Sequence, residues 1–221
     1  MVQNHFHCPV CQYQGEFIAF RGRLHAQCPQ CKCLERHRLQ FVIFNKLIDQ
    51  LPTKSLAILH CAPDPFFAEM LKNNFGTYES ADIAMSGVDH QVDLQSLPFE
   101  NNRYDIVFAS HVLEHIKDDL SALKEISRIL RPGGLAILPV PIIGEKTYEY
   151  DQPNPAEDYH VRAPGLDYYQ RYKPYFSKIK YYRSQEIPAE NQAYVYCDSK
   201  YLHPMKYSEY QIFDLVPVCY K

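Results

Sequence analysis

The chain has 221 residues, of which 46% are hydrophobic and 22% charged, so it can form one sizeable core with a small appendage and is too apolar for a disordered chain. Its formal net charge of −3 provides no overall attraction to nucleic acid or to an anionic membrane. The sequence has no run of about 18 apolar residues that could span a bilayer, and its start lacks the apolar core of a secretory signal, so a cytoplasmic location is expected.

Two pairs of closely spaced cysteines open the chain. Cys8 and Cys11 are followed, after sixteen intervening residues, by Cys28 and Cys31, a spacing typical of a four-thiolate zinc site. Each two-residue spacer forms a turn that directs both sulfurs at one ion, and four thiolates complete a closed, structural tetrahedron. The alternatives are a redox pair or two disulfides, but the sequence indicates neither a thioredoxin-like helix nor an oxidising compartment. Cys33 is expected to be a spare small residue.

A helix is expected directly after the second cysteine pair. Apolar residues recur at helical spacing from Leu34 to Ile48, and the helix should end before Pro52. The sequence Glu-Arg-His-Arg at residues 35–38 could grip a phosphate, but ion pairs that join the ribbon to the main domain are favoured because two arginines make a small footprint. We therefore expect residues 1–50 to form a zinc ribbon with its connecting helix, and residues 51–221 to form the main domain.

From Ser55 onward, strand and helix patterns alternate. The expected helices are residues 66–72 and residues 118–130; the second begins with two aspartates and ends at a Pro-Gly-Gly sequence. A short apolar strand is expected at residues 56–60, a weak strand at residues 77–81, and buried strands at residues 104–110 and 135–140. This alternation predicts an α/β protein with a Rossmann-like, mostly parallel sheet and right-handed crossovers.

Polar residues follow several of these strands. In such sheets the ligand binds beyond the carboxyl ends of the strands. Asp82 lies 22 residues after His60, the separation at which a carboxylate can accept both hydroxyls of an adenosine ribose. Asp93 could face an adenine amino group, and Ser110 and His111 end the strand expected at residues 104–110. A lone aspartate in a loop is usually a turn former, but three polar strand ends along one sheet edge favour ligand contact.

These residues resemble the class I S-adenosylmethionine-dependent methyltransferases, specifically the type 11-like domain with an N-terminal four-cysteine zinc ribbon. The resemblance rests on CPVC and CPQCKCLERHRL at the front, LHCAPDPFF at the first loop, and the central segment of residues 89–142. It implies a seven-stranded sheet, S-adenosylmethionine as methyl donor, and structural Zn²⁺ held by Cys8, Cys11, Cys28 and Cys31. The donor-binding residues that it implies are His60, Ala62, Asp64, Asp82, Ile83, Asp93, Leu94, Ser110 and His111.

The first loop departs from the usual family pattern. A glycine-rich loop normally lets the backbone approach the donor closely, whereas residues 60–65 read His-Cys-Ala-Pro-Asp-Pro. The branch that this sequence resembles has a similar His-x-Ala-Pro-acid loop, so we expect a variant cradle in which Ala62 is small enough for close approach and Pro63 lacks an N–H. The missing glycines also leave an alternative open, a catalytically inactive binding or scaffold protein with the same fold.

Methyl transfer from an activated sulfonium mainly requires alignment and exclusion of water. If the acceptor keeps its proton, the candidate bases are His111, His115 and His160, with Glu114 and Asp64 as weaker candidates. His115 is equally compatible with a packed histidine bonded to a backbone carbonyl.

Residues 111–115 also match H-x-x-E-H, an inverted zinc-peptidase signature. That motif needs both histidines on one helix face, but His111 directly follows a strand, so the peptidase reading is disfavoured. One zinc ion per chain would support the ribbon alone, whereas two would favour a hydrolase.

Fifteen of the eighteen tyrosines lie from residue 148 onward. The region of about 144–210 could therefore line an acceptor pocket, stack on a base or sugar, bury a homodimer surface, or simply cover an insertion. Residues 177–182 and 210–216 are expected to form the closing strand pair. The expected acceptor is a small molecule, such as a sugar or a cell-surface precursor; nucleic-acid or protein methylation is disfavoured because the chain has no strong basic stripe.

Overall fold

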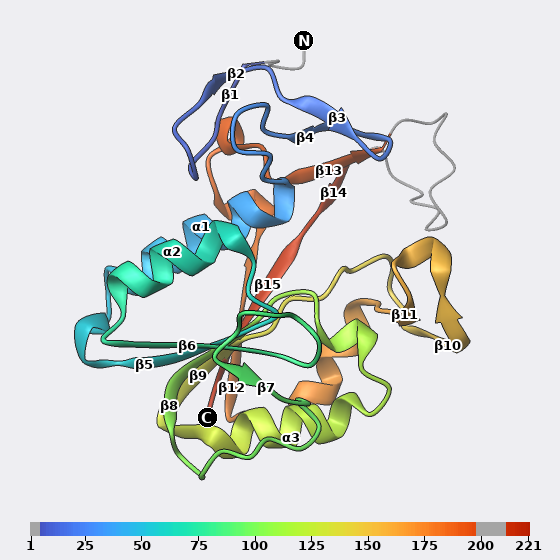
Figure 1. Ribbon diagram of the computed structural model, residues 1–221. Coiled ribbons are helices and arrows are strands. Elements are labelled where there is room, and N and C mark those ends of the chain that lie inside the picture. Colours follow the sequence, from blue (N-terminus) through green and yellow to red (C-terminus); the bar gives the residue numbers. More distant parts are fainter. Residues whose placement is uncertain (1–4, 198–210) are drawn as a thin grey trace. The chain divides into compact units, whose positions relative to one another are not determined.

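The computed structural model describes residues 5–197 and 211–221, and the chain divides into two compact units (Figure 1). Unit 1 comprises residues 1–50 and 182–216, and unit 2 comprises residues 51–181 and 217–221. The boundary expected near residue 50 is thus one of three places where the chain passes between the units. Residues 182–216, which were expected in the main domain, belong instead to the unit that contains the cysteine pairs.

Unit 1 is built from short strands and one longer helix, α1 (Glu35–Ile48), at the position expected from the apolar spacing. The helix buries Leu39, Ile43 and Phe44 on one side. Two strands form an antiparallel pair and four form a sheet in the order β14-β13-β4-β3. The strands are β1 (Phe6–His7), β2 (Gln14–Gly15), β3 (Ile18–Phe20), β4 (Arg23–Gln27), β13 (Tyr194–Cys197) and β14 (Gln211–Phe213).

The charged first turn of α1 makes its contacts within unit 1. Arg23 Nε donates to Glu35 at 3.0 Å. Arg38 is fully buried, and its Nε donates to the carbonyl oxygens of Asn191 and Gln192 at 3.0 and 2.8 Å. Arg38 is therefore used inside this unit and not as a phosphate grip, and it links the C-terminal segment to the N-terminal one.

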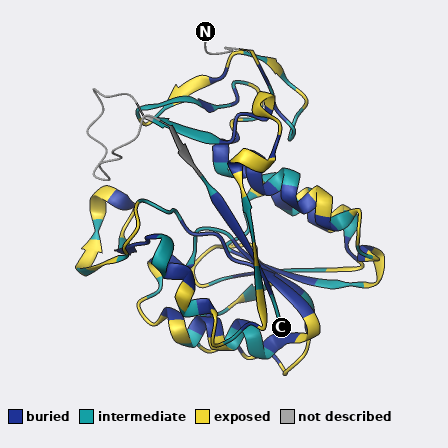
Figure 2. Cartoon of the chain, turned by 180° about the vertical axis from the view of Figure 1, so that it is seen from behind, coloured by how far each residue is buried: buried dark blue, intermediate teal, exposed yellow. Residues whose placement is uncertain are grey.

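Unit 2 contains a seven-stranded, mostly parallel sheet with the order β12-β15-β9-β8-β5-β6-β7 (Figure 1), which confirms the expected α/β, Rossmann-like fold. Strands β5 to β9 run parallel, and β15 pairs antiparallel with β9. The apolar runs of β5 and β8 are almost entirely buried, and Figure 2 colours the centre of the sheet accordingly. The strands are β5 (Ala57–Cys61), β6 (Thr77–Asp82), β7 (His90–Gln91), β8 (Tyr104–Ala109), β9 (Leu130–Ile137), β12 (Lys178–Arg183) and β15 (Leu215–Tyr220).

Two capped helices connect the parallel strands. In α2 (Pro65–Asn74), the Asp64 side chain accepts a hydrogen bond from Phe66 N at 2.9 Å, and proline occupies the first position, where it needs no N–H partner. In α3 (Asp119–Ile129), Asp118 caps the first turn through Ser121 N at 3.1 Å. Helix α3 ends at Ile129, and β9 begins at the next residue. The Pro-Gly-Gly sequence, which was expected to end the helix, lies inside β9.

The single closing strand expected at residues 210–216 is divided: β14 pairs with β13 in unit 1, whereas β15 pairs with β9 in unit 2. The other closing strand, expected at residues 177–182, is β12. Part of the tyrosine-rich region, residues 198–210, lies outside the described residues.

The remainder of the tyrosine-rich region contains a hairpin that the sequence analysis did not identify, formed by β10 (Tyr148–Asn154) and β11 (His160–Ala163). The described residues also form short 3-10 helices, which are η1 (Thr53–Ser55), η2 (Leu113–His115), η3 (Pro155–Glu157), η4 (Leu166–Tyr172), η5 (Ser184–Glu186) and η6 (Ala189–Asn191). Among the described residues, no helix has an apolar stretch long enough to cross a membrane.

Candidate functional site

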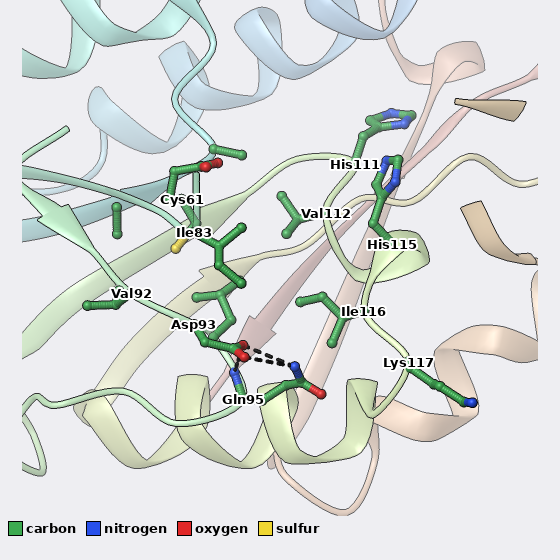
Figure 3. A pocket seen from close by; sticks show the side chains of 14 residues that line it. Cys61, Ile83, Val92, Asp93, Gln95, His111, Val112, His115, Ile116 and Lys117 are labelled. Atoms are coloured by element: carbon green, nitrogen blue, oxygen red, sulfur yellow. Dashed lines mark hydrogen bonds between the residues drawn. The ribbon is translucent and has the colours of Figure 1, made fainter. Parts of the chain in front are cut away.

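A cavity of about 380 Å³ opens at the carboxyl ends of β5, β6 and β8 (Figure 3). Strands β5 and β8 are neighbours, but the chain continues from β5 to β6 on one side and from β8 to β9 on the other. This reversal creates the switch point at which α/β sheets bind ligands. The cavity is lined by Cys61, Ala62, Ala81, Asp82, Ile83, Val92, Asp93, Leu94, Gln95, His111, Val112, His115, Ile116 and Lys117.

Six of the nine residues expected to bind the donor line this cavity. They are Ala62, Asp82, Ile83, Asp93, Leu94 and His111. His60, Asp64 and Ser110 are not among the lining residues. Gln95 and Lys117 also line the cavity but were not predicted from the sequence. Gln95 follows the predicted Asp93 by two residues, which offered a signal, whereas Lys117 lies beyond η2 and offered none.

His60 is a packing residue. Its side chain is fully buried and stacks on Phe108 with ring centroids 4.9 Å apart, and its Nδ1 lies 3.2 Å from Tyr78 Oη. Burial lowers the pKa of His60 to about 3, because a charged imidazole loses its hydration inside the sheet. The neutral His60 ring therefore helps to hold β5 in place. The Asp64 carboxylate caps α2.

The first loop adopts a glycine-like conformation without a glycine. Ala62 has a φ of +47°, in the left-handed region that costs most L residues about 1–2 kcal/mol. Its backbone N–H donates to Ala81 O at 2.8 Å, which ties the end of β5 to the end of β6. Because the side chain is only a methyl group, the backbone at the cavity wall remains accessible.

The two predicted acidic residues are held by local hydrogen bonds. One carboxylate oxygen of Asp82 accepts from the N–H groups of Ala84 and Met85, each at 2.7 Å. Asp93 accepts from Gln95 N at 2.8 Å, and the Gln95 amide reaches both Asp93 oxygens at 3.1 and 3.0 Å (Figure 3). Both carboxylates are thus preorganised at the ends of neighbouring strands, where they can accept further hydrogen bonds from a ligand.

The three predicted catalytic histidines converge on Glu114. His111 and His115 lie at the same end of the cavity (Figure 3). His111 Nδ1 is 3.3 Å from Glu114 Oε1, and His160 Nε2 is 4.0 Å from the same oxygen. The rings of His115 and His160 meet edge to face with centroids 4.6 Å apart. His111 precedes η2 while His115 is part of it, so the two histidines do not share one helix as the peptidase signature requires.

The charge state of this cluster follows from its surroundings. Burial opposes the ionisation of Glu114, but His111 and His115 together hold the pKa of its carboxyl group below the ordinary value. Burial also lowers the pKa of His160, which neighbouring Glu114 only partly offsets. At neutral pH the cluster therefore combines a buried carboxylate with a neutral His160 imidazole.

Arg162 positions the turn that carries Glu114 and His115. The guanidinium is almost fully buried. Its Nη1 donates to the carbonyl oxygens of Leu113 and Ile116 at 2.8 and 2.6 Å, and its Nη2 donates to Lys117 O at 2.9 Å. These bonds from β11 provide donors for the carbonyl groups of Ile116 and Lys117, and a second donor for Leu113 O, which also accepts from Ile116 N.

The four predicted metal-ligating cysteines form a second site, in unit 1. Their sulfur atoms all lie within 4.8 Å of one another, with Cys8 Sγ 3.7 Å from Cys31 Sγ and Cys11 Sγ 3.6 Å from Cys28 Sγ. These separations exceed the disulfide bond length of about 2.05 Å. They are close to the edge of about 3.8 Å expected for a tetrahedron with metal–sulfur bonds of about 2.3 Å.

The two cysteine turns have the same local structure. Gln12 N donates to Cys8 O at 2.8 Å, and Lys32 N donates to Cys28 O at 2.9 Å. Gln12 and Lys32, which follow the second cysteine of each pair, have left-handed φ angles of +64° and +67°. Cys33 is buried with its Sγ 3.4 Å from Cys8 Sγ, but it is not part of the four-cysteine group.

The sheet order and the cavity at the switch point are those of a Rossmann-like α/β fold. Residues 56–138 match the family model described as a methyltransferase domain.

Curated relatives match parts of the same chain. A demethylmenaquinone methyltransferase from Staphylococcus carnosus is 45% identical over 47 residues, which cover 21% of this chain and 20% of that protein. A sterol 4-C-methyltransferase from Caenorhabditis elegans is 39% identical over 76 residues, covering 34% of this chain and 21% of that protein. The chain thus matches about a fifth of the length of these relatives.

Solved structures share the fold at low sequence identity. The MccD protein has a TM-score of 0.56 at 16% identity, covering 82% of this chain and 97% of that chain. An S-adenosylmethionine-dependent methyltransferase from Mesorhizobium loti has a TM-score of 0.53 at 12% identity, and the match covers 80% of this chain and 97% of that chain. The [4+2]-cyclase SpnF has a TM-score of 0.57 at 14% identity, and the match covers 100% of this chain and 87% of that chain. Because one of these proteins is described as a cyclase, the fold alone does not determine the reaction.

Proposed function

We propose that the protein binds S-adenosylmethionine in the cavity of unit 2 and transfers its methyl group to a small-molecule acceptor. The observation that carries this proposal is the pair of preorganised carboxylates, Asp82 and Asp93, on strand ends that border a cavity at the switch point. Both lie within the segment that matches the methyltransferase domain. The names of the two curated relatives, which refer to a menaquinone precursor and a sterol, support a small acceptor.

Each part of the donor has a suitable partner in the cavity. Asp82 is proposed to accept hydrogen bonds from the ribose hydroxyls, and Asp93 from the adenine amino group. Ile83, with 65% of its surface exposed, offers an apolar contact for the adenine ring, and the backbone around Ala62 forms the cradle for the methionine part. The left-handed φ of Ala62 supports donor binding, because the loop takes the shape for which glycine is normally needed.

The proposed reaction needs alignment more than it needs acid–base chemistry. The bond between the donor sulfur and the methyl carbon breaks while a bond from the acceptor atom to that carbon forms, and holding the three atoms in line can supply about 7–11 kcal/mol. An acceptor that keeps its proton passes it to a base. His115 is exposed and lines the cavity, so it is the histidine best placed for this role, while His111 and His160 adjoin the buried Glu114.

We further propose that the four-cysteine cluster of unit 1 binds structural Zn²⁺. The equivalent turns and the sulfur separations fit a tetrahedral thiolate site. Four protein ligands leave no open position on the ion, so this site would stabilise unit 1 and take no part in methyl transfer.

Calorimetric titration with S-adenosylmethionine and with its demethylated product tests donor binding. We expect both to bind, and we expect Asp82→Ala to weaken binding by about 1–3 kcal/mol, or roughly 5- to 150-fold, through lost charge-assisted hydrogen bonds. Asp82→Asn keeps an oxygen for the Ala84 and Met85 N–H groups and isolates the effect of charge. It should also bind more weakly than the wild type.

Asp151→Asn, an exposed position on β10, is the matched control and should leave the affinity unchanged. If neither S-adenosylmethionine nor its demethylated product binds at millimolar concentration, the proposed methyl transfer is refuted. Unchanged affinity in both Asp82 variants would show that the ribose lies elsewhere.

A further inference from the structure

Three potential metal ligands from two separate elements of unit 2 come together beside the cavity. Glu114 and His115 belong to η2, and His160 begins β11. One ligand atom from each side chain lies within 4.8 Å of the other two. Bonds of about 2.0–2.2 Å to one ion place its ligand atoms about 3–4 Å apart. Side-chain rotations that move the ligand atoms by on the order of 1 Å would therefore complete a site.

The carboxylate at the centre of this group lacks the hydrogen bonds that burial demands. Glu114 is fully buried, and within the described part of the chain neither of its oxygens accepts a hydrogen bond of good geometry, although His111 Nδ1 lies 3.3 Å from Oε1 as an ion-pair partner. The same holds for the buried Nδ1 of His160. Leaving a buried carboxylate without such partners costs several kcal/mol, and a bound cation would remove that cost. We propose that Glu114, His115 and His160 form a second metal site, for a divalent transition-metal ion such as Zn²⁺ or Fe²⁺.

The surroundings of His160 support the proposal. Its Nε2 faces Glu114 at 4.0 Å, and its other ring nitrogen, Nδ1, lies 3.8 Å from Glu157 Oε2. A carboxylate behind a histidine is the usual arrangement that orients a metal-binding imidazole. Glu157 is itself buried and is fixed by the Tyr150 hydroxyl, which donates to its oxygens at 2.8 and 2.9 Å.

The ligand types indicate the class of ion and the use of the site. Two imidazoles and one carboxylate suit zinc or iron, whereas magnesium and calcium prefer oxygen ligands. Three protein ligands leave positions open for water or substrate. His115 lines the cavity, so an open position would be available to an oxygen of the methyl acceptor. In the metal-bound protein His115 would be a ligand and would not also act as the base for the acceptor's proton. This use rests on the proposed methyl transfer, whereas the metal site itself does not.

The proposed ligand set differs from the one that the H-x-x-E-H signature would give. His111 is not among the three clustered ligands, and the third ligand comes from β11, about 45 residues further along the chain. Two metal ions per chain would therefore not indicate a hydrolase here. They would indicate one closed thiolate site in unit 1 and one open site beside the donor cavity.

Metal content measured by equilibrium dialysis of the full chain tests the proposal. At micromolar free Zn²⁺ we expect two zinc ions per chain in the wild type, and one in Glu114→Gln and in His160→Gln. His90→Gln changes a histidine that pairs with Glu79 outside the cluster and should retain two. One zinc ion per chain in the wild type, or two in folded Glu114→Gln, overturns the second site.

Cobalt substitution of the wild type provides a readout that does not depend on variant folding. Co²⁺ bound by cysteines gives intense sulfur-to-metal charge-transfer absorption, whereas Co²⁺ bound by nitrogen and oxygen does not. We expect the first equivalent of Co²⁺ to produce the thiolate bands and a second to bind without increasing them. Absence of the second equivalent overturns the proposal. Donor titration is measured separately, so failure of the metal site and failure of donor binding are distinguishable.

Discussion

Two residues that line the cavity adopt backbone conformations normally left to glycine. Ala62 has a φ of +47° and His111 a φ of +55°. Each is held by one backbone hydrogen bond, from Ala62 N to Ala81 O at 2.8 Å and from His111 N to Pro139 O at 2.9 Å. Strained backbone that persists at a cavity wall must be imposed by the surrounding sheet. The first loop therefore reaches a left-handed backbone conformation at Ala62 without glycine, at a cost in conformational energy.

Ala62→Gly should stabilise unit 2. Glycine relieves a left-handed strain of about 1–2 kcal/mol but gains roughly 0.5–1 kcal/mol of unfolded-state freedom, so the expected net gain is about 0.5–1 kcal/mol. Urea denaturation measures the change in the free energy of unfolding, and hydrogen exchange of the β5 amides measures the local change. The matched control is Ala68→Gly inside α2, which should destabilise by about 1 kcal/mol. Equal destabilisation by the two substitutions would contradict the strain argument.

At the scale of elements, the sequence was sufficient where a pattern is local. Strands β5 and β8 are contiguous apolar runs, and α2 and α3 begin at capping aspartates, so their positions could be predicted. Asp82 and Asp93 could be assigned to the cavity because they lie at strand ends: Asp82 ends β6, and Asp93 lies two residues after β7. His60 could not be assigned correctly, because one residue of register decides whether the end of a strand faces the cavity or the core.

The contacts around η2 could not be predicted, because they join segments that are far apart in the chain. Arg162 reaches the carbonyl oxygens of Leu113, Ile116 and Lys117 from β11. No local pattern in residues 148–163 indicates that their hairpin packs on this turn. For the same reason, the separation of β14 and β15 into two sheets was not visible in one short apolar run.

Arg162→Lys should loosen η2. A lysine ammonium cannot reproduce the planar fork that donates to three carbonyl groups, so buried acceptors would remain unpaired at a cost of about 2–4 kcal/mol. Hydrogen exchange should accelerate at His115 N and Ile116 N, which donate to Val112 O and Leu113 O. The measurement is exchange mass spectrometry combined with urea denaturation.

The control for this prediction is Arg103→Lys. Arg103 pairs with Glu79 at 2.9 Å at a side chain that is 40% exposed, and exposed ion pairs contribute about 0–1 kcal/mol. Comparable effects of the two substitutions would mean that the Arg162 hydrogen bonds do not determine the stability of the turn.

At the scale of the whole molecule, unit 1 is a discontinuous assembly of two chain segments, residues 1–50 and 182–216. Contacts such as those of Arg38 with Asn191 and Gln192 join the segments. A unit of this size buries a small apolar core, so its stability should depend strongly on the metal proposed for the cysteine cluster. Unit 2 has a seven-stranded sheet with its own buried strands, and its stability should depend on that metal much less.

Loss of the thiolate-bound zinc should therefore unfold unit 1 selectively. Metal binding contributes on the order of 10–16 kcal/mol in zinc-finger peptides, more than the stability expected of a small unit. After Cys28→Ser, hydrogen exchange should become fast in α1 and β4, while β5, β8 and β9 keep most of their protection. Cys33→Ser alters a neighbouring buried cysteine outside the four-cysteine group and should retain both zinc and protection. Retained protection of α1 in zinc-free Cys28→Ser protein would show that packing alone holds unit 1 together.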